Sequence, residues 1–363
     1  MYGEKLKTST SVHKSLFRDD PKMKGNTLTI LLIFGSIVSI ILAIGIGPYS
    51  IHPVTVIEII FSKLPFFTDS IANHFTHTEE NIVWGLRIPR VLLGMLVGAS
   101  LAVTGVAMQA LVRNQLADPF ILGVSSGASA TATLGMLFGV FSFLGTYALS
   151  ISAFIGALIT ISIVYTISRV RGRINITQLL LTGVAIAMIM EAITSFITLS
   201  APNALGLHNA TFWMSGSLAG AKWGYLKIPL VVIILCLTVL MTNHRALNAL
   251  LIGDETAGSL GINVIRTQKI LILISSLLAG VTIAVSGSIG FIGLMVPHMA
   301  RLLIGSDHKR VLPVSALLGG ILVVWTDVVA RIIIAPEELP IGILTALIGG
   351  PFFIWMLKRK SNR

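Results

Sequence analysis

Residues 87–111 read RIPRVLLGMLVGASLAVTGVAMQAL, in which two arginines three positions apart precede a long run without charge. A helix needs about 20 apolar residues to cross the roughly 30 Å of hydrocarbon in a bilayer. The stretch therefore predicts a membrane-spanning helix. Its small residues Gly94, Gly98 and Ala102 recur every four positions, so they share one face and predict close packing against a neighbouring helix.

The composition of the whole chain agrees with a membrane protein. Of its 363 residues, 54% are hydrophobic and 11% charged, and the mean hydropathy is +0.90. Soluble domains carry about 25% charged residues. The net charge of +11 raises nucleic acid or anionic lipid as partners, but its distribution favours cytoplasmic loops beside membrane lipid and no nucleic acid. The single cysteine, Cys236, excludes an internal disulfide.

Apolar stretches along the chain predict an all-α integral membrane protein with about ten transmembrane helices. We expect them at 27–47, 88–111, 121–141, 147–167, 179–199, 225–243, 270–289, 293–304, 311–331 and 340–357. The eighth is short and contains a proline, which is typical of a partial or tilted span. The first is too long and lacks the cleavage site of a signal peptide.

The basic residues orient this arrangement. With both termini cytoplasmic, all but six of the 26 Lys and Arg fall on the cytoplasmic side, as the positive-inside rule favours. The six outer cations are Lys63, Arg87, Arg90, Lys222, Lys227 and Arg331. We thus predict a flexible cytoplasmic tail (1–26), a single transmembrane domain (27–357), an outer loop near 48–87, and a basic cytoplasmic C-terminus (358–363).

Several sequence motifs are missing. No G-x-x-x-x-G-K-[ST] phosphate loop, H-E-x-x-H pair or Cys/His cluster occurs. We therefore predict no cofactor, no metal site and no catalytic residues. An intramembrane enzyme would need paired catalytic groups at one depth, and none is visible. If the chain moves a solute with ATP, another chain must hydrolyse it.

The cytoplasmic segment 247–262 is longer than a minimal connector. Leu247, Leu250 and Leu251 have helical spacing, and Gly253-Asp254-Glu255-Thr256 resembles a helix start, with acids in the first turn. Two interpretations follow from this pattern: an interfacial helix that lies on lipid, or a short coupling helix that docks into an ATPase.

Two further polar residues lie in apolar stretches. Glu191 is in the middle of a predicted span, where an acid is costly and usually faces a cavity or a partner. It either faces a translocation pathway or forms a hydrogen bond to a neighbouring helix. For His298 we predict packing and not metal binding.

Several segments in order along the chain resemble the FecCD-type permeases, the membrane subunits of ABC importers for iron–siderophore complexes, haem and cobalamin. They are RIPRVLLGMLVGASLAVTGVAMQALVRNQLADPFILGVSSGA, LLLTGVAIA, GDETAGSLGI, GSIGFIGLMVPHMARLLIGSDHK and DVVARIIIAPEELPIGILTALIGGPFFIWML. The resemblance implies the type II ABC importer permease fold, with ten helices and both termini inside.

The resemblance also implies roles for the outer arginines. In the family, two arginines of an R-[LI]-P-R segment and one at the end of the ninth helix receive glutamates of the extracellular binding protein. The matching positions here are Arg87, Arg90 and Arg331, and guanidinium binds carboxylate in a bidentate manner. Asp327 lies four residues before Arg331 and can orient it. The alternative is that these arginines extend to lipid phosphates.

Other matching segments imply gates and a coupling element. NQLADP matches a cytoplasmic gate loop and nominates Asn114 and Leu116, although Gln115 replaces the usual proline. NITQ matches the second gate segment and nominates Asn175, Ile176 and Thr177. GDETAGSLG matches the ATPase coupling segment, with the contact residues Asp254, Glu255, Thr256, Ala257, Gly258, Ser259, Leu260 and Gly261.

Together these features predict a permease subunit that carries an iron–siderophore complex across a bacterial cytoplasmic membrane. The expected partners are a second permease subunit, identical or similar, two ABC ATPases and an extracellular or periplasmic binding protein. Haem or cobalamin is the alternative substrate. An ion-coupled secondary transporter is a further alternative, but such proteins show inverted repeats and several coupling residues at the midplane.

Overall fold

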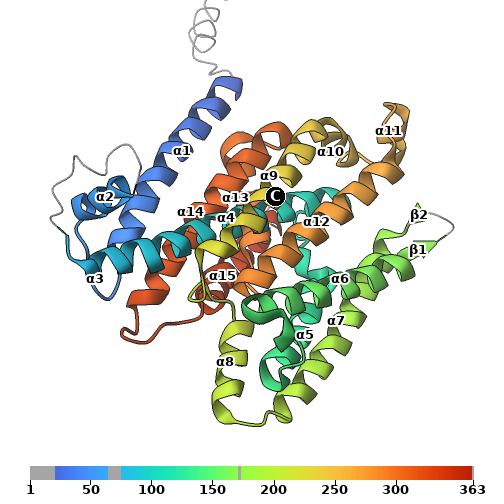
Figure 1. Cartoon of the computed structure of the whole chain (residues 1–363). Helices are drawn as coiled ribbons and strands as arrows, with labels where there is room; N and C mark the ends of the chain where they lie inside the picture. The colour runs from blue at the N-terminus through green and yellow to red at the C-terminus, as the bar shows by residue number, and fades with distance from the viewer. Residues whose placement is uncertain (1–20, 64–74, 171–172, 362–363) are drawn as a thin grey trace, which may run out of the picture.

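The computed structural model describes residues 21–63, 75–170 and 173–361, which are almost entirely helical (Figure 1). The single pair of strands in these ranges consists of β1 (Arg169–Val170) and β2 (Arg173–Ile174), which pair antiparallel with Arg169 opposite Ile174. The predicted all-α membrane fold is therefore confirmed.

Eight helices are long and apolar enough to span a membrane, counted over the described ranges. They belong to α1 (Pro21–Gly45), α4 (Ile88–Val112), α6 (Ala148–Ser168), α7 (Ile176–Leu199), α9 (Trp223–Thr242), α12 (Val264–Ser286), α14 (His308–Ile332) and α15 (Ile341–Ser361). The shorter α-helices are α2 (Pro53–Ser62), α3 (His77–Glu80), α5 (Val124–Phe138), α8 (Ala204–Met214), α10 (His244–Leu250), α11 (Asp254–Ser259) and α13 (Ile292–Ile304).

Three further helical segments have a different winding. The π-helix η1 (Asn81–Arg87) joins α3 to α4, and the 3-10 helices η2 (Pro119–Leu122) and η3 (Ser142–Tyr147) precede α5 and α6. Eight of the ten predicted spans match long helices. The predicted spans 121–141 and 293–304 match α5 and α13, which are shorter than the bilayer core requires. The count of ten stays a prediction.

Some predicted boundaries are wrong. Residues 21–26 of the predicted tail are the first turns of α1, while residues 1–20 lie outside the described residues. The outer loop expected near 48–87 contains α2, and from His77 to Val112 the chain forms one helix of 36 residues. At about 1.5 Å per residue, this helix is longer than the hydrocarbon core, so its first turns extend beyond it.

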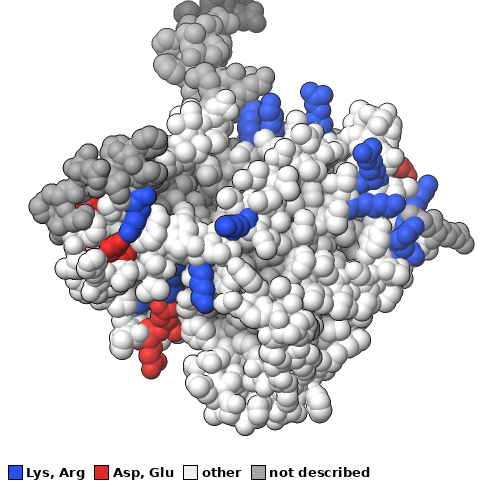
Figure 2. Space-filling model, viewed as in Figure 1, with Lys and Arg blue, Asp and Glu red and all other residues white. Residues whose placement is uncertain are grey.

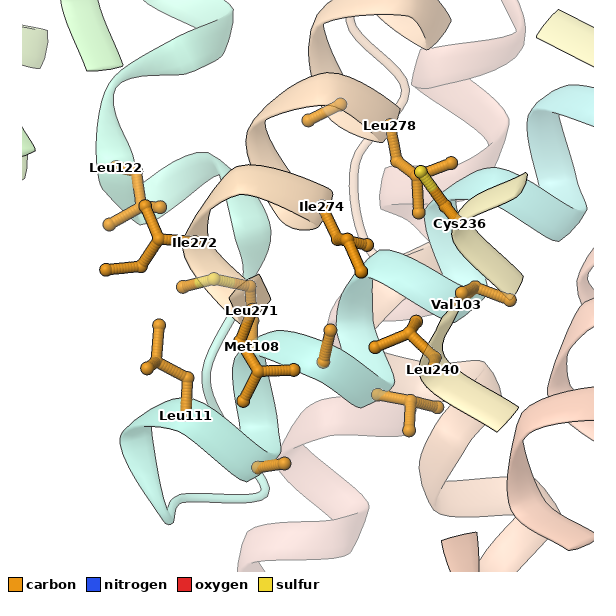
Figure 3. Packing of buried hydrophobic residues seen from close by; sticks show 14 of the residues in the cluster. Val103, Met108, Leu111, Leu122, Cys236, Leu240, Leu271, Ile272, Ile274 and Leu278 are labelled. Atoms are coloured by element: carbon orange, nitrogen blue, oxygen red, sulfur yellow. The ribbon is translucent and has the colours of Figure 1, made fainter. Parts of the chain in front are cut away.

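Helix α4 runs through the middle of the molecule. Nearly every residue from Ile88 to Leu111 is buried, and α14, α12, α13 and α9 all pack against it. Figure 3 shows the largest hydrophobic cluster, to which α4 contributes Met108 and Leu111, α9 contributes Leu240 and α12 contributes Leu271. Cys236 is a buried member of this cluster.

The small residues of α4 allow this central position. A Cβ atom on Gly98 would lie 2.1 Å from the carbonyl oxygen of Gly319 in α14, and one on Gly105 would lie 1.8 Å from that of Gly293 in α13. Real side chains do not tolerate such distances. The predicted close-packing face of 87–111 is therefore confirmed, and it receives α14.

Asparagine or aspartate is the N-cap residue of three of the long helices. The side-chain oxygen of Asn175 accepts a hydrogen bond from the Gln178 N–H at the start of α7. Asn263 and Asp307 do the same for α12 and α14. Each cap satisfies a backbone donor that has no partner inside the helix.

Basic side chains gather at one side of the molecule. In Figure 2, Lys and Arg lie along the upper and right edges, where Figure 1 places α10, α11 and the β1–β2 hairpin. These segments are the connections to which the sequence assigned the cytoplasmic cations.

The close approach of α4 to its neighbours yields a direct prediction. Gly98→Ala and Gly105→Ala should each destabilise the protein by about 1–3 kcal/mol, because backbone must move to admit the methyl group. Gly35→Ala in α1 is the control, since no atom lies within 4 Å of its Cβ position. Thermal unfolding midpoints in detergent should fall for the first two variants only. Equal midpoints for all three would contradict this packing.

Candidate functional site

The predicted arginines lie together at the end of the α4–α14 pair opposite the basic side. Arg87 is the last residue of η1, Arg90 lies in the first turn of α4, and Arg331 lies in the last turn of α14. Asp327 is one turn before Arg331 on α14. The structure thus gathers residues that are more than 200 positions apart in the sequence.

Asp327 holds two of the arginines. Its carboxylate accepts hydrogen bonds from Nε and Nη2 of Arg90 at 2.9–3.1 Å. It also pairs with Nε of Arg331 at 3.2 Å. Asp327 thus contacts Arg331 one turn away on the same helix, and Arg90 shares the same carboxylate. Removing one partner of such a buried pair costs about 3–5 kcal/mol, because the remaining charge is uncompensated.

Arg87 has a different set of partners. Its guanidinium donates to the carbonyl oxygens of Ile44 and Gly45 at 2.9 and 3.0 Å, and also to that of Tyr49. Arg331 donates to the carbonyl of Ala43 at 3.2 Å. The last carbonyls of a helix lack partners within it and carry a partial negative charge. The two arginines therefore cap the end of α1.

These contacts change the interpretation of the cluster. Arg87 and Arg331 are only 7% and 3% exposed, and both are bonded within the chain. The alternative that they extend to lipid phosphates is thus wrong for these two residues. An open pocket of three available guanidinium groups is not what the structure shows. Docking of a binding protein to this cluster stays a prediction.

One further member of the cluster, Glu338, was not predicted from the sequence. Oε1 of Glu338, in the connection between α14 and α15, accepts a hydrogen bond from Nη1 of Arg90 at 2.8 Å. Glu338 is the most exposed member of this ion-pair network, with 30% of its side chain accessible. It stands beside Glu337 in the otherwise apolar segment IIIAPEELP, and this pair of acids close to Arg331 was an available signal.

The two predicted gate segments lie at connections between helices. In the first, Oδ1 of Asn114 accepts a hydrogen bond from the Leu116 N–H at 3.0 Å, which forms a compact turn after α4. In the second, Asn175 caps α7, and Ile176 and Thr177 are its first residues. Asn114, Asn175 and Thr177 are exposed, and Leu116 and Ile176 are half-buried.

A close helix contact relates the two segments. The chain continues from the first gate segment into η2, which packs against α7. There a Cβ atom on Gly183 would lie 2.3 Å from the carbonyl oxygen of Ile121. Gly183 is two turns along α7 from Asn175, so the gate segments are attached to elements in backbone contact. Their gating role stays a prediction.

The predicted coupling segment forms two short helices, α10 and α11. Leu247 and Leu250 are buried, whereas Leu251 is exposed. As expected, α11 begins at Asp254 with acids in its first turn. In α11 Ala257 is buried and faces the protein, while Glu255, Thr256, Gly258 and Ser259 are exposed, as are Leu260 and Gly261 after it.

An ion pair joins the coupling segment to the first gate segment. Nη2 of Arg113, the residue before Asn114, donates to Oδ2 of Asp254 at 2.9 Å. Arg113 itself has a left-handed backbone conformation, with φ of 57°, which ends α4. The ion pair therefore links α11 to the loop after α4. Arg113 could not be nominated from local sequence patterns, because its partner is 141 residues away.

Glu191 lies on the most uncovered of the long helices. It is exposed on α7, as are Leu181, Val184 and Met188. Within the described part of the chain, Glu191 has neither an ion pair nor a hydrogen bond through its carboxylate. Its predicted alternative, a hydrogen bond to a neighbouring helix, is absent inside this subunit. His298 lies edge-on to Phe352 at 6.2 Å, which agrees with the predicted packing role.

The chain is similar in sequence to a family of transport proteins and to several of its characterised members. The model of the FecCD transport family matches residues 32–359. A hemin transport system permease of Yersinia pestis is 42% identical over 77% of this chain and 84% of its own length. A cobalamin import system permease of Halobacterium salinarum is 40% identical, covering 79% of this chain and 76% of its own. A Fe(3+) dicitrate transport system permease of Escherichia coli is 40% identical, covering 78% and 87%.

The chain belongs to the FecCD transport family. A solved structure, described as a metal-chelate type ABC transporter in an inward-facing conformation, superimposes with a TM-score of 0.78. It is 30% identical and the match covers 94% of this chain and all of that chain.

Family membership fixes the general activity. The protein is a membrane-embedded permease of an ABC importer and is not itself an enzyme. A permease of this family works with an ATPase and a substrate-binding protein, which are separate chains. The relatives carry different substrates, so the family leaves the particular chelate open.

The first gate segment, NQLADP, contains one acid, and its environment is unusual. Asp118 accepts a hydrogen bond from the Phe120 N–H at 2.7 Å and caps η2. Burial raises the pKa of its carboxyl from 3.8 to about 6, and this hydrogen bond offsets the effect only in part. The folded state therefore holds this proton more tightly than the unfolded chain does.

The raised pKa of Asp118 makes the stability of the folded protein depend on pH. The stability from protonated Asp118 is complete below pH 3.8 and is lost as the pH rises to about 6. Asp118→Asn keeps the oxygen acceptor but cannot ionise. The thermal midpoint of this variant, relative to the native protein, should therefore rise between about pH 4 and about pH 7. A difference that does not change with pH would contradict the buried carboxylate.

Proposed function

We propose that this chain is the permease subunit of an importer that carries an iron–siderophore complex across the cell membrane. In this proposal it pairs with a second permease subunit, identical or similar. Two cytoplasmic ATPases drive the pair and an extracellular binding protein supplies it. Transport proceeds by alternating access, because the two conformations differ in their affinity for ATP-bound ATPases.

The uncovered face of α7 is the observation that carries this proposal. Leu181, Met188 and Leu199 follow one another at helical spacing, are strongly exposed and share a face. Glu191 stands at the edge of the same face, one turn from Met188. An acid directed to lipid at mid-membrane costs about 2.5–3.5 kcal/mol or more. A second subunit that encloses a polar pathway along α7 removes this cost.

The choice of substrate rests on the chemistry of the relatives. A permease for Fe(3+) dicitrate is 40% identical, and the structural match is described as a metal-chelate type transporter. Iron bound by a small organic chelator is the class common to these descriptions. Haem or cobalamin is the alternative substrate. A secondary transporter is disfavoured, because such proteins have several ion-coupling residues at the midplane.

The exposed end of the arginine cluster supports the proposed docking site. Arg90 makes its outermost contact with Glu338, which is partly accessible. A carboxylate of the binding protein can replace Glu338 on the same guanidinium nitrogen without disturbing Asp327. In this form of docking the binding protein contacts Arg90, whereas Arg87 and Arg331 stabilise the site through their hydrogen bonds to the end of α1.

The geometry of α11 supports the proposed ATPase contact. Helix α11 projects from the rest of the protein. Ala257 is its buried residue, whereas most of its other residues are exposed. The exposed apolar residues Ile252 and Leu260 flank it. A complementary groove on an ATPase would cover them. The Arg113–Asp254 ion pair would then convey the motion to the loop at Asn114.

Uptake by reconstituted transporter tests the function. Proteoliposomes that hold the permease, its ATPase and its binding protein should accumulate radiolabelled iron–siderophore only with ATP, in preference to haem and cobalamin. Glu191→Gln should lower uptake by roughly tenfold without changing the thermal midpoint, while Glu191→Asp retains much of it. Uptake driven by an ion gradient without ATPase would refute the proposal. Unchanged uptake by Glu191→Gln would remove Glu191 from the pathway.

Affinity for the binding protein tests the docking site. Arg90→Gln should weaken binding by about tenfold, because a charge-assisted hydrogen bond is lost. Glu338→Gln should strengthen it by up to about fivefold, because the internal competitor is removed. Glu337→Gln makes the same charge change without touching Arg90 and serves as control. If all three variants bind like the native protein and assemble with the ATPase, the cluster is purely structural.

A further inference from the structure

A cavity of about 570 Å³ lies where α1, α9 and α14 approach one another. Its polar wall consists of Asp307, Lys309 and Arg310 at the start of α14, with Asn26 and Thr29 of α1. Its apolar wall includes Ile30 of α1, Met241 of α9 and Pro313 of α14. The cavity therefore has a charged part and an apolar part, and neither belongs to the sites described above.

The cavity lies at the level of the membrane surface. The apolar span of α1 begins at Gly25 and that of α14 at His308, and both ends border the cavity. The charge distribution makes this end cytoplasmic. In Figures 1 and 2, basic side chains lie beside the upper end of α1. The polar wall is thus at the level of lipid headgroups.

The polar wall favours an anion. Lys309 is exposed, and the side chain of Arg310 packs against Gly25, where a Cβ atom would lie 2.8 Å from its Cδ. The first residues of α14 add the partial positive charge of a helix N-terminus. The one carboxylate on the wall, Asp307, accepts hydrogen bonds from Asn248 Nδ2 and the Lys309 N–H at 2.9 and 3.1 Å.

Asp307 remains ionised, and its carboxylate accepts hydrogen bonds from within the protein. Burial raises the pKa of this carboxyl, but the hydrogen bonds from Asn248 and Lys309 and the charge of Arg310 outweigh burial, so its pKa is below the ordinary value. The carboxylate of Asp307 therefore interacts with the backbone N–H of Lys309 at the start of α14 and with the side chain of Asn248. Among the described residues that line the cavity, the charged side chains are thus two cations, Lys309 and Arg310, and this one carboxylate.

The apolar wall continues along the membrane-facing surface of α1. Ile30 is 68% exposed, and Phe34 and Ile37, four and seven positions later, are also largely exposed. This spacing places the three side chains on one helix face. The face leads from the basic end of the cavity into the depth of the hydrocarbon.

We propose that this cavity binds an anionic phospholipid of the cytoplasmic leaflet, with its phosphate at Lys309 and Arg310 and an acyl chain along Ile30, Phe34 and Ile37. A soluble anion would make no use of the apolar stripe, and a neutral lipid would make no use of the cations. Basic cavities between helices at the cytoplasmic side suit anionic headgroups. The lipid would join α1 to α14 and α9, whatever substrate the transporter carries.

Native mass spectrometry of the delipidated transporter complex, reloaded from phosphatidylglycerol or phosphatidylcholine vesicles, tests this proposal. The native protein should retain phosphatidylglycerol in preference to phosphatidylcholine. A Lys309→Gln, Arg310→Gln variant should retain roughly tenfold less, since each cation near a membrane surface contributes to anionic-lipid binding. Ile30→Asn, which leaves both cations in place, should also reduce retention. Lys358→Gln, at the end of α15, is the matched control and should retain the lipid.

Three outcomes would overturn the proposal. The first is equal retention by the native protein and the double variant, with thermal midpoints showing that both are folded. The second is displacement of the lipid by inorganic phosphate as efficiently as by excess phosphatidylglycerol, which would identify a simple anion site. The third is efficient cross-linking of an Ile30→Cys variant to a second permease subunit, which would make the stripe a subunit interface.

Discussion

The backbone of α4 is in direct contact with the backbones of α13 and α14, and the rest of the molecule is arranged around this contact. It exists because Gly98 and Gly105 of α4 face Gly319 of α14 and Gly293 of α13, where no Cβ atom fits. In a membrane, helices gain little from hydrophobic burial against each other, so close packing of small residues has to hold them together. Since α4 and α14 cross the molecule as a tightly packed pair, the arginine cluster at one end and the gate loop at the other are attached to the same rigid unit.

The arginine cluster shows how the chain places cations at its outer edge. Asp327 forms ion pairs with both Arg90 and Arg331, and the carbonyl groups at the end of α1 accept hydrogen bonds from Arg87 and Arg331. These interactions attach α1 to the α4–α14 pair, which gives the arginines a structural role within one subunit. A docking role is compatible with it at Arg90, because its contact with Glu338 is the part of the network that reaches the surface.

Among the uncovered apolar faces of the subunit, those of α7 and α1 contain or adjoin charged groups. On α7 the exposed face carries Glu191, and on α1 it leads from a basic cavity. These two faces need different neighbours. An intramembrane acid requires a polar pathway or a protein partner, whereas a stripe without charge below a pair of cations is complementary to a phospholipid. Both faces are compatible with the proposed pair of permease subunits in a lipid membrane.

The sequence alone determined the membrane class, most spans, the small-residue face of α4, the helix start at Asp254 and the family. These follow from local periodicity, composition and ordered motifs, which do not require knowledge of distant contacts. The sequence also nominated Arg87, Arg90, Arg331 and Asp327 as one group. It could not assign Glu338 to Arg90 or Arg113 to Asp254, because each partner is more than 140 residues away and local patterns carry no information on such pairs.

Only the tertiary structure decided what those side chains do. It buried Arg87 against the end of α1 and gave Arg90 two carboxylates. It left Glu191 without a partner in the described chain. The physical reason is that a guanidinium or carboxylate in a membrane protein is defined by the groups that replace water around it, and these groups come from helices that only the fold brings together.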